Sequence, residues 1–416
     1  MSTSESQVER LRRILDVARH MAATTDLDVL LRTIVDATRE VLTCERATIF
    51  LYDATTNELY SRVATGVKSI RFPADRGIAG AAARDRAVVN VTDAYADERF
   101  NPEIDRETGF RTRNLLTFPL ENLDGDLMGV LQALNKTDEP FDHADEELAR
   151  VLSAQAGVAL HRWRLLEEYA EKQRMARDLE IARQIQLALF PKENPTITGY
   201  EIAGWNRSAD ETGGDCYDFM PLEDGRLAML LADATGHGIG AALVIAQCRS
   251  LVRAMLSVTQ DLARVVASVN RLLTEDLASE RFVTAFFGIL DPRNQRLEYI
   301  AAGQGPLMFL TSEAVECRTA NALPLGVLED LEFPTDSFDF QDPNTLVLLT
   351  DGFYEAANPA SELFGEERVT SFIRNHPNLP LPDLIAALHD DVTRFTGRQS
   401  HADDLTAVLV RRSGSI

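Results

Sequence analysis

The stretch Leu227–Gly240, LAMLLADATGHGIG, decides the fold of the C-terminal half of this chain. It predicts a buried apolar strand that ends at Asp233, then a glycine-containing turn, then a helix that begins at Ala241. Glycine in the turn lets the backbone approach whatever lies beside it. A carboxylate at the end of a buried strand is costly unless its charge is compensated, and a metal ion is the usual partner. The stretch therefore indicates a cation site at Asp233.

Three other motifs place aspartates where strands are predicted to begin or end. TGGDCYDF has Asp215 directly after two glycines, and LVLLTDGFYEA has Asp351 at the end of an apolar run. HADDLTAVLV has Asp403 and Asp404 directly before the last predicted strand. One such aspartate is ordinary, because aspartate is common in turns and caps. Four motifs of this kind favour one shared site, and oxygen ligands suit Mg²⁺ or Mn²⁺ better than zinc or copper.

The C-terminal half beyond Pro195 is rich in predicted strands. They are YEIAGWN, RLAMLLADA, FVTAFFGIL, RLEYIAAG, LMFLT, TLVLLTD and LTAVLVRR. Helices are predicted at Gly240–Leu256, Asp261–Leu277 and Pro382–Phe395. Because these helices are grouped rather than alternating with single strands, we expect layered sheets covered by helices.

The N-terminal half begins with two predicted helices, the second at Leu27–Leu42. From Ala47 the period changes, and ATIFLYD, ELYSRVAT, AVVNVTDA, NLLTFPL and LMGVLQALN predict strands. A long helix follows from about Ala144. This order predicts an α+β domain with an antiparallel sheet and helices on one side of it. The first helix has a narrow apolar seam, formed by Val8, Leu11, Leu15, Ala18 and Ala22.

The segment Ala144–Leu189 is predicted to be one long, charged helix that ends before Pro191. Its apolar seam changes register near Gln173, which in a coiled coil requires local unwinding. A surface helix packed along its own domain is one interpretation. We favour a parallel coiled coil that forms a homodimer and transmits a signal, and a register break is a natural two-state element. The seam residues on either side of the break are Trp163, Leu166, Ala170 and Gln173, then Met175, Leu179, Ala182 and Leu189.

Composition excludes several classes of protein. The 416 residues suffice for two or three domains, and a net charge of −23 argues against nucleic acid as the main partner. The four cysteines are scattered with no CxxC motif, so neither zinc nor a disulfide framework is expected. The N-terminus has no apolar signal segment, and no run approaches the roughly 18 apolar residues of a membrane span. We expect a cytoplasmic protein.

The region from about Asp26 to Arg162 resembles a GAF domain of the kind found in cyclic-nucleotide phosphodiesterases and adenylate cyclases. The resemblance includes the NKFDE signature, in which Lys136 is expected to pair with Asp145 while Phe141 packs beneath. It implies a small-molecule sensor, with a cyclic nucleotide as the specific hypothesis and another ligand or a partner chain as the alternatives. The five signature residues are Asn135, Lys136, Phe141, Asp145 and Glu146.

The region from Leu179 to Arg411 resembles the bacterial serine phosphatases that regulate sigma factors and sporulation, a branch of the metal-dependent PPM-type phosphatases. The resemblance lies in LEIARQIQLALFP, GGDCYDF, DATGHG, AGQGPL, LPLGV, TDGFYEA, FGEERV and DDLTAVLVRR. It implies an αββα-layered domain that holds two Mn²⁺ or Mg²⁺ ions. Asp233 and the carbonyl of Ala234 would contact the ions, Asp351 and Asp403 would hold one of them, and Asp215 would serve the other.

The catalytic residues implied by this resemblance are Asp233, Asp351 and Asp403, and the reaction needs no protein nucleophile because a water attacks phosphorus. Cys216 is therefore expected to be a packing residue. His237 stands four residues after Asp233 rather than two, so we expect it to stabilise the turn. Gln304 stands where relatives often have histidine, which leaves the function of that loop open.

The sequence thus predicts an N-terminal helix (1–23), a GAF sensor domain (24–162), a helical linker (163–192) and a PPM-type phosphatase domain (193–416). The resemblance implies that the substrate is a phosphorylated anti-sigma-factor antagonist. The alternative is a catalytically silent scaffold that binds a phosphoprotein. A dinucleotide-binding turn at Gly236–Ala241 is excluded, because no second parallel strand ending in an acid follows.

Overall fold

The computed structural model describes residues 14–62, 70–277, 280–311, 314–340, 344–397 and 402–413. Its contacts divide the chain into two compact units, Met1–Arg174 and Met175–Ile416. Residues 14–23 are helical, as the apolar seam predicts. The first two seam positions, Val8 and Leu11, lie outside the described residues.

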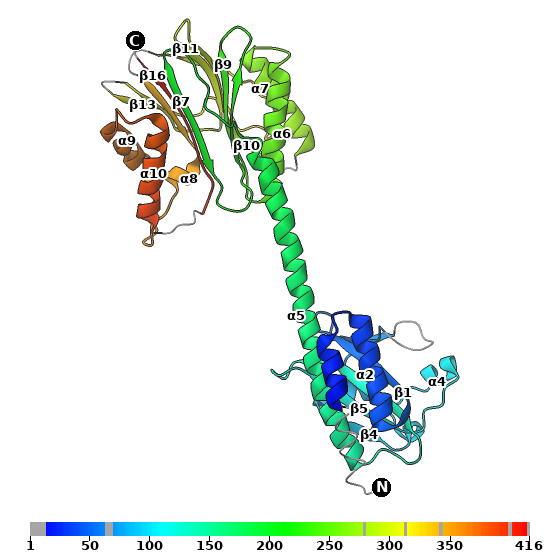
Figure 1. Ribbon diagram of the computed structural model, residues 1–416. Coiled ribbons are helices and arrows are strands. Elements are labelled where there is room, and N and C mark those ends of the chain that lie inside the picture. The colour runs from blue at the N-terminus through cyan, green and yellow to red at the C-terminus, as the bar shows by residue number, and fades with distance from the viewer. Residues whose placement is uncertain are drawn as a thin grey trace. The chain divides into compact units, whose positions relative to one another are not determined.

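The first unit contains a six-stranded antiparallel sheet in the order β3-β2-β1-β6-β5-β4 (Figure 1). All five strand segments expected from the sequence contribute strands to this sheet. In the segment ELYSRVAT, the strand comprises the first three residues, and the last three lie outside the described residues. The strands are β1 (Cys44–Asp53), β2 (Glu58–Tyr60), β3 (Arg71–Pro73), β4 (Val89–Val91), β5 (Leu115–Glu121) and β6 (Leu127–Lys136). The helices are α2 (Leu27–Leu42), α3 (Gly77–Asp85), η1 (Ala94–Ala96), α4 (Glu103–Thr108) and the start of α5 (His143–Leu187).

The long helices of this unit pack on one face of the sheet, as expected. On β1, Ile49 and Leu51 point into the core that α2 and α5 share, while Phe50 between them points to the other face. That other face is not open, which corrects the expectation of helices on one side only. It is covered by α3, whose Ala79, Ala82 and Ala83 pack against it. Small alanine side chains let this short helix lie close to the strands.

The NKFDE signature has the structural function expected of it. Lys136 at the end of β6 forms an ion pair with Asp145 in the first turn of α5, and Phe141 is buried in the core of the domain. Asn135 is fully buried and adopts a left-handed conformation, with its amide hydrogen bonded to Glu45 Oε2 and to the carbonyl of Arg111. The signature thus joins the last strand to the helix that leaves the domain.

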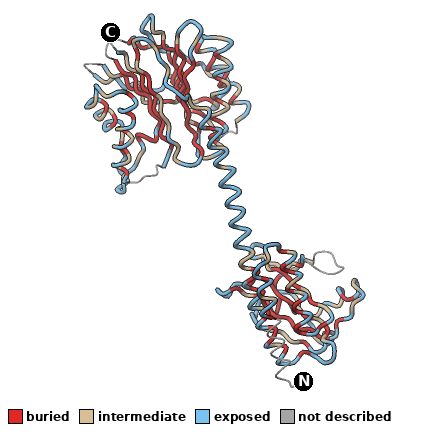
Figure 2. Tube along the Cα trace, viewed as in Figure 1, coloured by how far each residue is buried: buried red, intermediate tan, exposed pale blue. Residues whose placement is uncertain are grey.

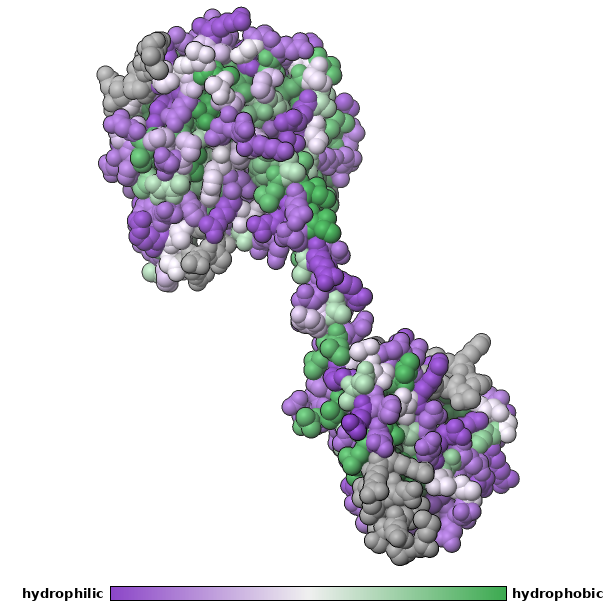
Figure 3. All heavy atoms as spheres, viewed as in Figure 1, coloured by the Kyte–Doolittle hydropathy of each residue, from purple (hydrophilic) through white to green (hydrophobic). Residues whose placement is uncertain are grey.

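Helix α5 runs from His143 to Leu187, which confirms the predicted long helix to within two residues at each end. Residues 164–178 are exposed along its whole circumference (Figure 2). Hydrophobic side chains lie among the hydrophilic ones on this stretch (Figure 3), including Leu166 and Met175 from the predicted seam.

The second unit contains two five-stranded antiparallel sheets, in the orders β14-β11-β10-β9-β8 and β13-β12-β15-β16-β7. Every strand segment predicted from the sequence is present; β8, β13 and β14 were not among the predicted segments. The first sheet comprises β8 (Asp215–Pro221), β9 (Leu227–Ala234), β10 (Val283–Asp291), β11 (Arg296–Ala302) and β14 (Asp336–Asp339). The second comprises β7 (Tyr200–Arg207), β12 (Leu307–Leu310), β13 (Val315–Arg318), β15 (Thr345–Leu349) and β16 (Leu405–Arg412).

The two sheets face one another across an apolar core, and helices cover their outer faces (Figures 1 and 2). On β9, Leu227, Met229 and Leu231 point between the sheets, while Leu230 points to the helices. This strand is buried on both sides, which explains its continuous apolar sequence. The helices on the first sheet are α6 (Ile239–Leu256) and α7 (Leu262–Asp276); those on the second are α8 (Asp351–Tyr354), α9 (Gly365–Asn375) and α10 (Leu381–Thr396). The αββα layering is therefore confirmed.

Helix α6 is long and apolar enough to span a membrane by length and composition, and it is the one such helix in the described part of the chain. Its packing accounts for that composition. Seven of its residues are buried, among them Ile245, Cys248 and Val252, in the core beneath the first sheet. A core helix of a soluble domain passes the same test, so the finding carries little weight for membrane insertion.

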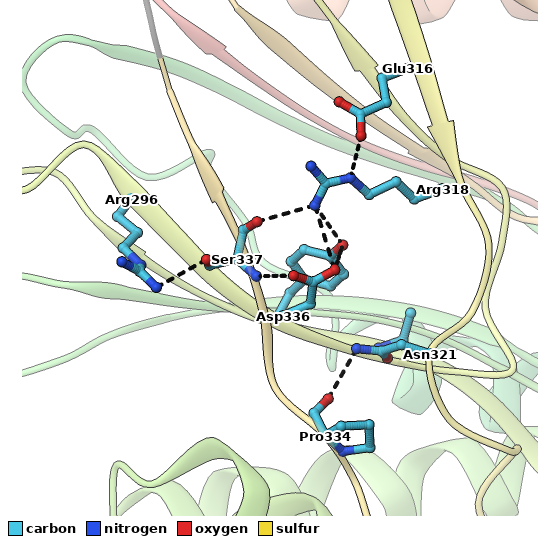
Figure 4. Close-up of polar contacts among 9 residues, drawn as sticks. Arg296, Glu316, Arg318, Asn321, Pro334, Asp336 and Ser337 are labelled. Carbon is cyan, nitrogen blue, oxygen red and sulfur yellow. Dashed lines mark hydrogen bonds and ion pairs between the residues drawn. The ribbon is translucent and has the colours of Figure 1, made fainter.

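Arg318 on β13 joins the two sheets at one edge of the layered domain (Figure 4). Its guanidinium donates to the hydroxyl of Tyr299 on β11 and to the carbonyl of Ser337 on β14, each at 3.1 Å. The same group lies 4.9 Å from the ring centroid of Phe309 and pairs with Glu316. Since β13 belongs to one sheet and β11 and β14 to the other, this arginine holds both edges.

Candidate active site

Asp233 and Asp215 lie side by side because β8 and β9 are antiparallel neighbours in which the two aspartates are direct partners. Asp215 begins β8 and is 2% exposed, and Asp233 stands one residue before the end of β9. On the other side of β9, Thr284 of β10 is the partner of Asp233. Strand pairing alone therefore brings together two acids eighteen positions apart in the sequence.

The second sheet supplies two hydroxyls to Asp215. Thr350, which precedes α8, donates to Asp215 Oδ2 at 2.8 Å, and Thr406 on β16 donates to the same oxygen at 2.6 Å. The backbone of Thr350 and Thr406 is also joined, by the hydrogen bond from Thr350 N to Thr406 O. Oδ2 of Asp215 is thus occupied by protein donors, which leaves Oδ1 as the oxygen for a ligand.

Asp351 and Asp403 come from the second sheet. Asp351 is the first residue of α8, directly after β15 and Thr350. Asp403 precedes β16, and its Oδ1 accepts from the backbone N–H of Asp404 at 2.8 Å. Both residues are exposed. The ends of β15 and β16 meet because these strands are antiparallel neighbours whose register pairs Leu349 with Ala407.

Asp404 fixes the loop that carries Asp215. Its Oδ1 accepts from Ala209 N at 2.8 Å, and its Oδ2 accepts from Gly214 N at 2.6 Å. A Cβ on Gly213 would overlap the Asp404 carboxylate, and one on Gly214 would lie 2.8 Å from the carbonyl oxygen of Ala234. The two glycines before Asp215 are therefore required by close approach, and Asp404 has a structural function.

The four carboxylates act on one another electrostatically. The pKa of Asp233 is raised from 3.8 to about 7, first by burial and then by the negative charges of Asp351 and Asp403. Burial, followed by the charge of Asp233, raises the pKa of Asp215 well above its ordinary value. Although the residue is exposed overall, partial desolvation of its carboxyl, followed by the charge of Asp403, raises the pKa of Asp351. The charges that shift these groups are all carboxylates, so among the described residues their repulsion is not offset by a positive charge.

This donor set fits a divalent cation in charge and ligand type, since carboxylate and carbonyl oxygens are the ligands that Mg²⁺ and Mn²⁺ prefer. Within the described ranges, however, no three acidic, histidine or cysteine side chains are gathered closely enough to hold an ion as they stand. Binding would therefore have to draw Asp233, Asp351 and Asp403 closer together, against a repulsion that the cation itself removes.

The other residues singled out from the sequence lie around this cluster. His237 has an exposed side chain in the turn after β9, with Nδ1 3.5 Å from Asp210 Oδ2. Gln304 is buried and donates to the carbonyl of Leu349, so it joins the loop after β11 to the end of β15. Cys216 is buried in the core beneath α6, and burial raises its thiol pKa. Its place in the core agrees with a packing residue.

Asp218 on β8 anchors α6. It is fully buried and pairs with Arg249 at 2.9 Å and with Arg253 at 2.5 Å. Two arginines one helical turn apart, at i and i+4, can both reach one carboxylate on the strand below. This pair of contacts holds α6, and with it the turn after Asp233, against the strand of Asp215.

Three residues of this region could not be identified from the sequence. Thr350 and Thr406 stood inside recognised motifs, TDGFYEA and DDLTAVLV, but nothing local indicated that both hydroxyls reach Asp215. Gln186 near the end of α5 donates to the carbonyl of Gly213 at 2.6 Å and accepts from Gly213 N at 3.0 Å. Gln186 stands inside the recognised motif LEIARQIQLALFP, but nothing local indicated this contact, and its burial (7% exposed) became visible only in the structure.

Comparison with known families gives two matches. Residues 223–413 match the family model of stage II sporulation protein E (SpoIIE), and residues 26–160 match the GAF domain. The solved SiaA-PP2C domain of Pseudomonas aeruginosa has a TM-score of 0.52 at 22% sequence identity, and the match covers 58% of this chain and 98% of that chain. At this identity the likeness establishes the fold of the second unit.

Two curated relatives match parts of the chain at low identity. The phosphoserine phosphatase RsbP of Bacillus subtilis (strain 168) is 25% identical over 241 residues, which cover 56% of this chain and 57% of that protein. The probable 3',5'-cyclic phosphodiesterase pde-5 of Caenorhabditis elegans is 31% identical over 170 residues, which cover 37% of this chain and 23% of that protein. The chain therefore spans less than two thirds of the length of either relative.

Proposed function

Because the chain joins a GAF domain to a SpoIIE-type PP2C phosphatase domain, we propose that it is a metal-dependent protein serine/threonine phosphatase of bacterial signalling, controlled by its GAF domain. The observation that carries the proposal is the group of aspartates at the ends of β8, β9, β15 and β16. Burial, followed by the negative charges of Asp351 and Asp403, raises the pKa of Asp233 to about 7, as expected of a site built around a cation.

We propose Asp233 and the carbonyl of Ala234 as ligands of two Mn²⁺ or Mg²⁺ ions, Asp351 and Asp403 as ligands of one, and Asp215 as a ligand of the other. Phosphatases of this family depend on these metals. The hydroxyls of Thr350 and Thr406 support the role of Asp215, because they hold one of its oxygens and turn the other toward Asp233.

When bound, such ions supply an activated water and neutralise charge on the phosphoryl group. The protein groups orient that chemistry. Asp404 holds the Gly213–Asp215 loop through backbone N–H groups, and the ion pairs of Asp218 hold α6. These contacts fix the positions of Asp215 and of the turn after Asp233. Positioning and electrostatic stabilisation are the main sources of rate in phosphoryl transfer.

The test is phosphate release from a phosphoserine peptide in the presence of Mn²⁺, Mg²⁺ or EDTA. We expect release by the wild-type chain with metal only, and a loss of at least a hundredfold in Asp233→Asn. Glu223→Gln serves as the control, because Glu223 lies exposed in the turn between β8 and β9 of the same sheet. If the wild-type chain released no phosphate with either metal, a scaffold that binds phosphoproteins without hydrolysing them would replace this proposal.

The substrate we propose is a phosphorylated anti-sigma-factor antagonist. The resemblance to phosphatases that regulate sigma factors supports it, and RsbP, the relative that matches much of this chain, is named a phosphoserine phosphatase. Dephosphorylation of such a protein by the purified chain, with a phosphotyrosine peptide left intact, would support the assignment. Preference for the tyrosine peptide would refute it.

We propose the division into an N-terminal helix (1–23), GAF domain (24–162), linker (163–192) and phosphatase domain (193–416), supported by the GAF match over residues 26–160 and the continuous helix α5. The linker is proposed to form a parallel coiled-coil homodimer. Exposed apolar side chains on α5 support this: Leu166 is 44% exposed and Met175 is 57% exposed. Leu166→Glu combined with Met175→Glu should convert a dimer into a monomer in light scattering, whereas an unchanged mass would exclude this interface.

For regulation, we propose that a ligand of the GAF domain, a cyclic nucleotide in the first instance, shifts the linker's register near Gln173. The similarity of the GAF region to a cyclic phosphodiesterase supports the choice of ligand. Replacing Gln173 and Arg174 by glycine should abolish any effect of cyclic GMP or cyclic AMP on phosphatase activity. A retained effect would exclude transmission through the helix. We further propose a cytoplasmic location, supported by the packing of α6 in the core of its domain, since α6 is the one helix of the described residues that is long and apolar enough to cross a membrane.

A further inference from the structure

A polar groove of about 480 Å³ lies beside the aspartate cluster, and no step of the proposed reaction uses it. One wall is the last turns of α5, with Arg183 and Gln186. The other wall is the end of β7 and the loop that follows it, with Asn206, Arg207, Asp210 and Glu211. The volume is in the range of pockets that bind small ligands or a few residues of a peptide.

Hydrogen bonds connect this groove directly to the carboxylates. Asn206 Nδ2 donates to Thr406 Oγ1 at 2.8 Å, and Thr406 Oγ1 in turn donates to Asp215 Oδ2 at 2.6 Å. In the loop, Ala209 N donates to Asp404 Oδ1 at 2.8 Å. Asp210 lies 3.5 Å from His237, which follows Asp233 in the turn after β9. The groove and the aspartates thus share a loop, and Asp210 places one end of the groove beside the turn that follows Asp233.

The groove is lined by both positively and negatively charged side chains. Arg183 projects from α5 and is exposed, and Arg207 at the end of β7 contacts Nε2 of His389 at 3.0 Å. Asp210 and Glu211 are the two acids of the groove, and both belong to the loop after β7. On the α5 wall the charged lining residue is Arg183, and its guanidinium favours an acidic side chain on that side of the groove. A guanidinium is also the side chain best matched to a carboxylate.

We propose that this groove binds the polypeptide that flanks the phosphoserine of the substrate, and that Arg183 determines specificity by recognising an acidic side chain close to that phosphoserine. The inference rests on the proposed phosphatase function and adds to it the substrate's local sequence. Arg183 is a specificity residue rather than a catalytic one, because its contact is with the flanking chain and not with the reacting phosphoryl group.

The position of Arg183 gives the linker a direct part in substrate recognition. Arg183 and Gln186 belong to α5, the same helix that begins at His143 in the GAF domain. Gln186 also holds Gly213 through two hydrogen bonds, so one turn of α5 contacts both the groove and the loop of Asp215. A change in this turn would alter KM for a protein substrate through the shape of the groove.

The experiment compares two phosphoserine heptapeptides that differ only at the positions flanking the phosphoserine, which are glutamate in one and lysine in the other. Hydrolysis with Mn²⁺ is measured for the full-length wild type, for Arg183→Glu and for Arg183→Lys. Arg177→Glu is the matched control. It makes the same charge change on the same helix, six residues away on a different face, and Arg177 does not line the groove.

We expect the wild type to prefer the glutamate peptide. In Arg183→Glu the KM for that peptide should rise about three- to tenfold, since one partly exposed ion pair is lost and a repulsion replaces it. The preference between the two peptides should vanish or reverse, with a smaller effect on kcat. Arg183→Lys should restore part of the preference, and Arg177→Glu should behave as the wild type. Equal preference in Arg183→Glu and Arg177→Glu would overturn the proposal.

Binding of the same peptides, labelled with fluorescein and followed by anisotropy, separates this inference from the proposed function. A wild type that binds the glutamate peptide through Arg183 but releases no phosphate would support the groove and refute the phosphatase. Hydrolysis with no dependence of KM or binding on Arg183 would support the phosphatase and refute the groove.

Discussion

Replacing Asp233 by asparagine should stabilise the metal-free protein although it destroys the proposed metal site. Burial and the charges of Asp351 and Asp403 raise the pKa of Asp233 from 3.8 to about 7. A rise of that size corresponds to a penalty of about 4 kcal/mol for folding with an ionised Asp233. Asparagine removes the charge and keeps the shape. Because its amide must find hydrogen bonds of its own, we expect a net gain of about 1–3 kcal/mol at pH 8.

The pH dependence of this gain follows from proton linkage. Below pH 3.8 the carboxyl is protonated in both the folded and the unfolded chain and contributes nothing. Between pH 3.8 and about 7 the unfolded chain loses this proton while the folded chain keeps it, so the stability of the metal-free wild type falls as pH rises. Above about pH 7 the penalty is complete. The difference in stability between Asp233→Asn and the wild type should therefore be less than half as large at pH 5 as at pH 8.

Urea unfolding in EDTA measures this difference, provided that the signal comes from the phosphatase domain alone. The chain has two tryptophans, Trp163 in α5 and Trp205 on β7, where Trp205 packs against Phe353. In a Trp163→Phe background the fluorescence of Trp205 reports on the second unit. Glu223→Gln is again the control and should leave the midpoint unchanged at both pH values, since Glu223 is exposed.

Two results would refute this reasoning. If Asp233→Asn were less stable than the wild type at pH 8 without metal, the aspartates would not repel one another in solution. If the gain were equal at pH 5 and pH 8, the charge of Asp233 would not be its cause. Addition of Mn²⁺ should stabilise the wild type and leave Asp233→Asn unaffected, which connects the measurement to the proposed ligands.

Three further predictions concern other contacts. Gly213→Ala should lower phosphatase activity at least tenfold, because its Cβ would overlap the carboxylate of Asp404; activity equal to the wild type would mean that the loop of Asp215 is free to move. Arg318→Ala should lower the free energy of unfolding by about 2 kcal/mol, because the hydrogen bonds of Arg318 and its contact with Phe309 are lost; urea unfolding followed by Trp205 fluorescence measures this. A decrease below about 0.5 kcal/mol would show that Arg318 does not stabilise the sheet edges. Lys136→Met should destabilise the GAF domain by about 3 kcal/mol in calorimetry, because it leaves the buried Asp145 unpaired. An unchanged unfolding transition of the GAF domain would contradict this.

The fold of each half was largely predictable from the sequence because the relevant signals are local. Continuous apolar runs such as LAMLLA predicted strands buried on both faces, and helical periodicity predicted α5, α6 and α7. The short helix α3 was missed, since six of its nine residues are glycine or alanine and show little apolar contrast. Strands β13 and β14 were missed because four residues with mixed burial carry almost no periodic signal.

The candidate site was also predictable from the sequence only in part. Asp215, Asp233, Asp351 and Asp403 were identified because each stands at the end of a recognisable strand in a recognisable motif. Their mutual electrostatic effect required the tertiary structure, since the pKa of Asp233 depends on charges 118 and 170 positions away in the sequence. Only the structure shows that no three of the described carboxylates lie close enough together to hold a metal ion.

By itself, the sequence determined which segments form strands and helices, where the acids stand on them, and the glycines that let the backbone approach those acids. Only the tertiary structure decided that Thr350 and Thr406 share one oxygen of Asp215, that Gln186 of α5 holds Gly213, and that Arg183 borders a groove beside them. The physical reason is how far apart in the sequence the interacting residues lie. A strand or helix is specified by the spacing of neighbouring side chains, whereas these contacts join residues up to 191 positions apart and depend on how the two sheets and the helix pack together.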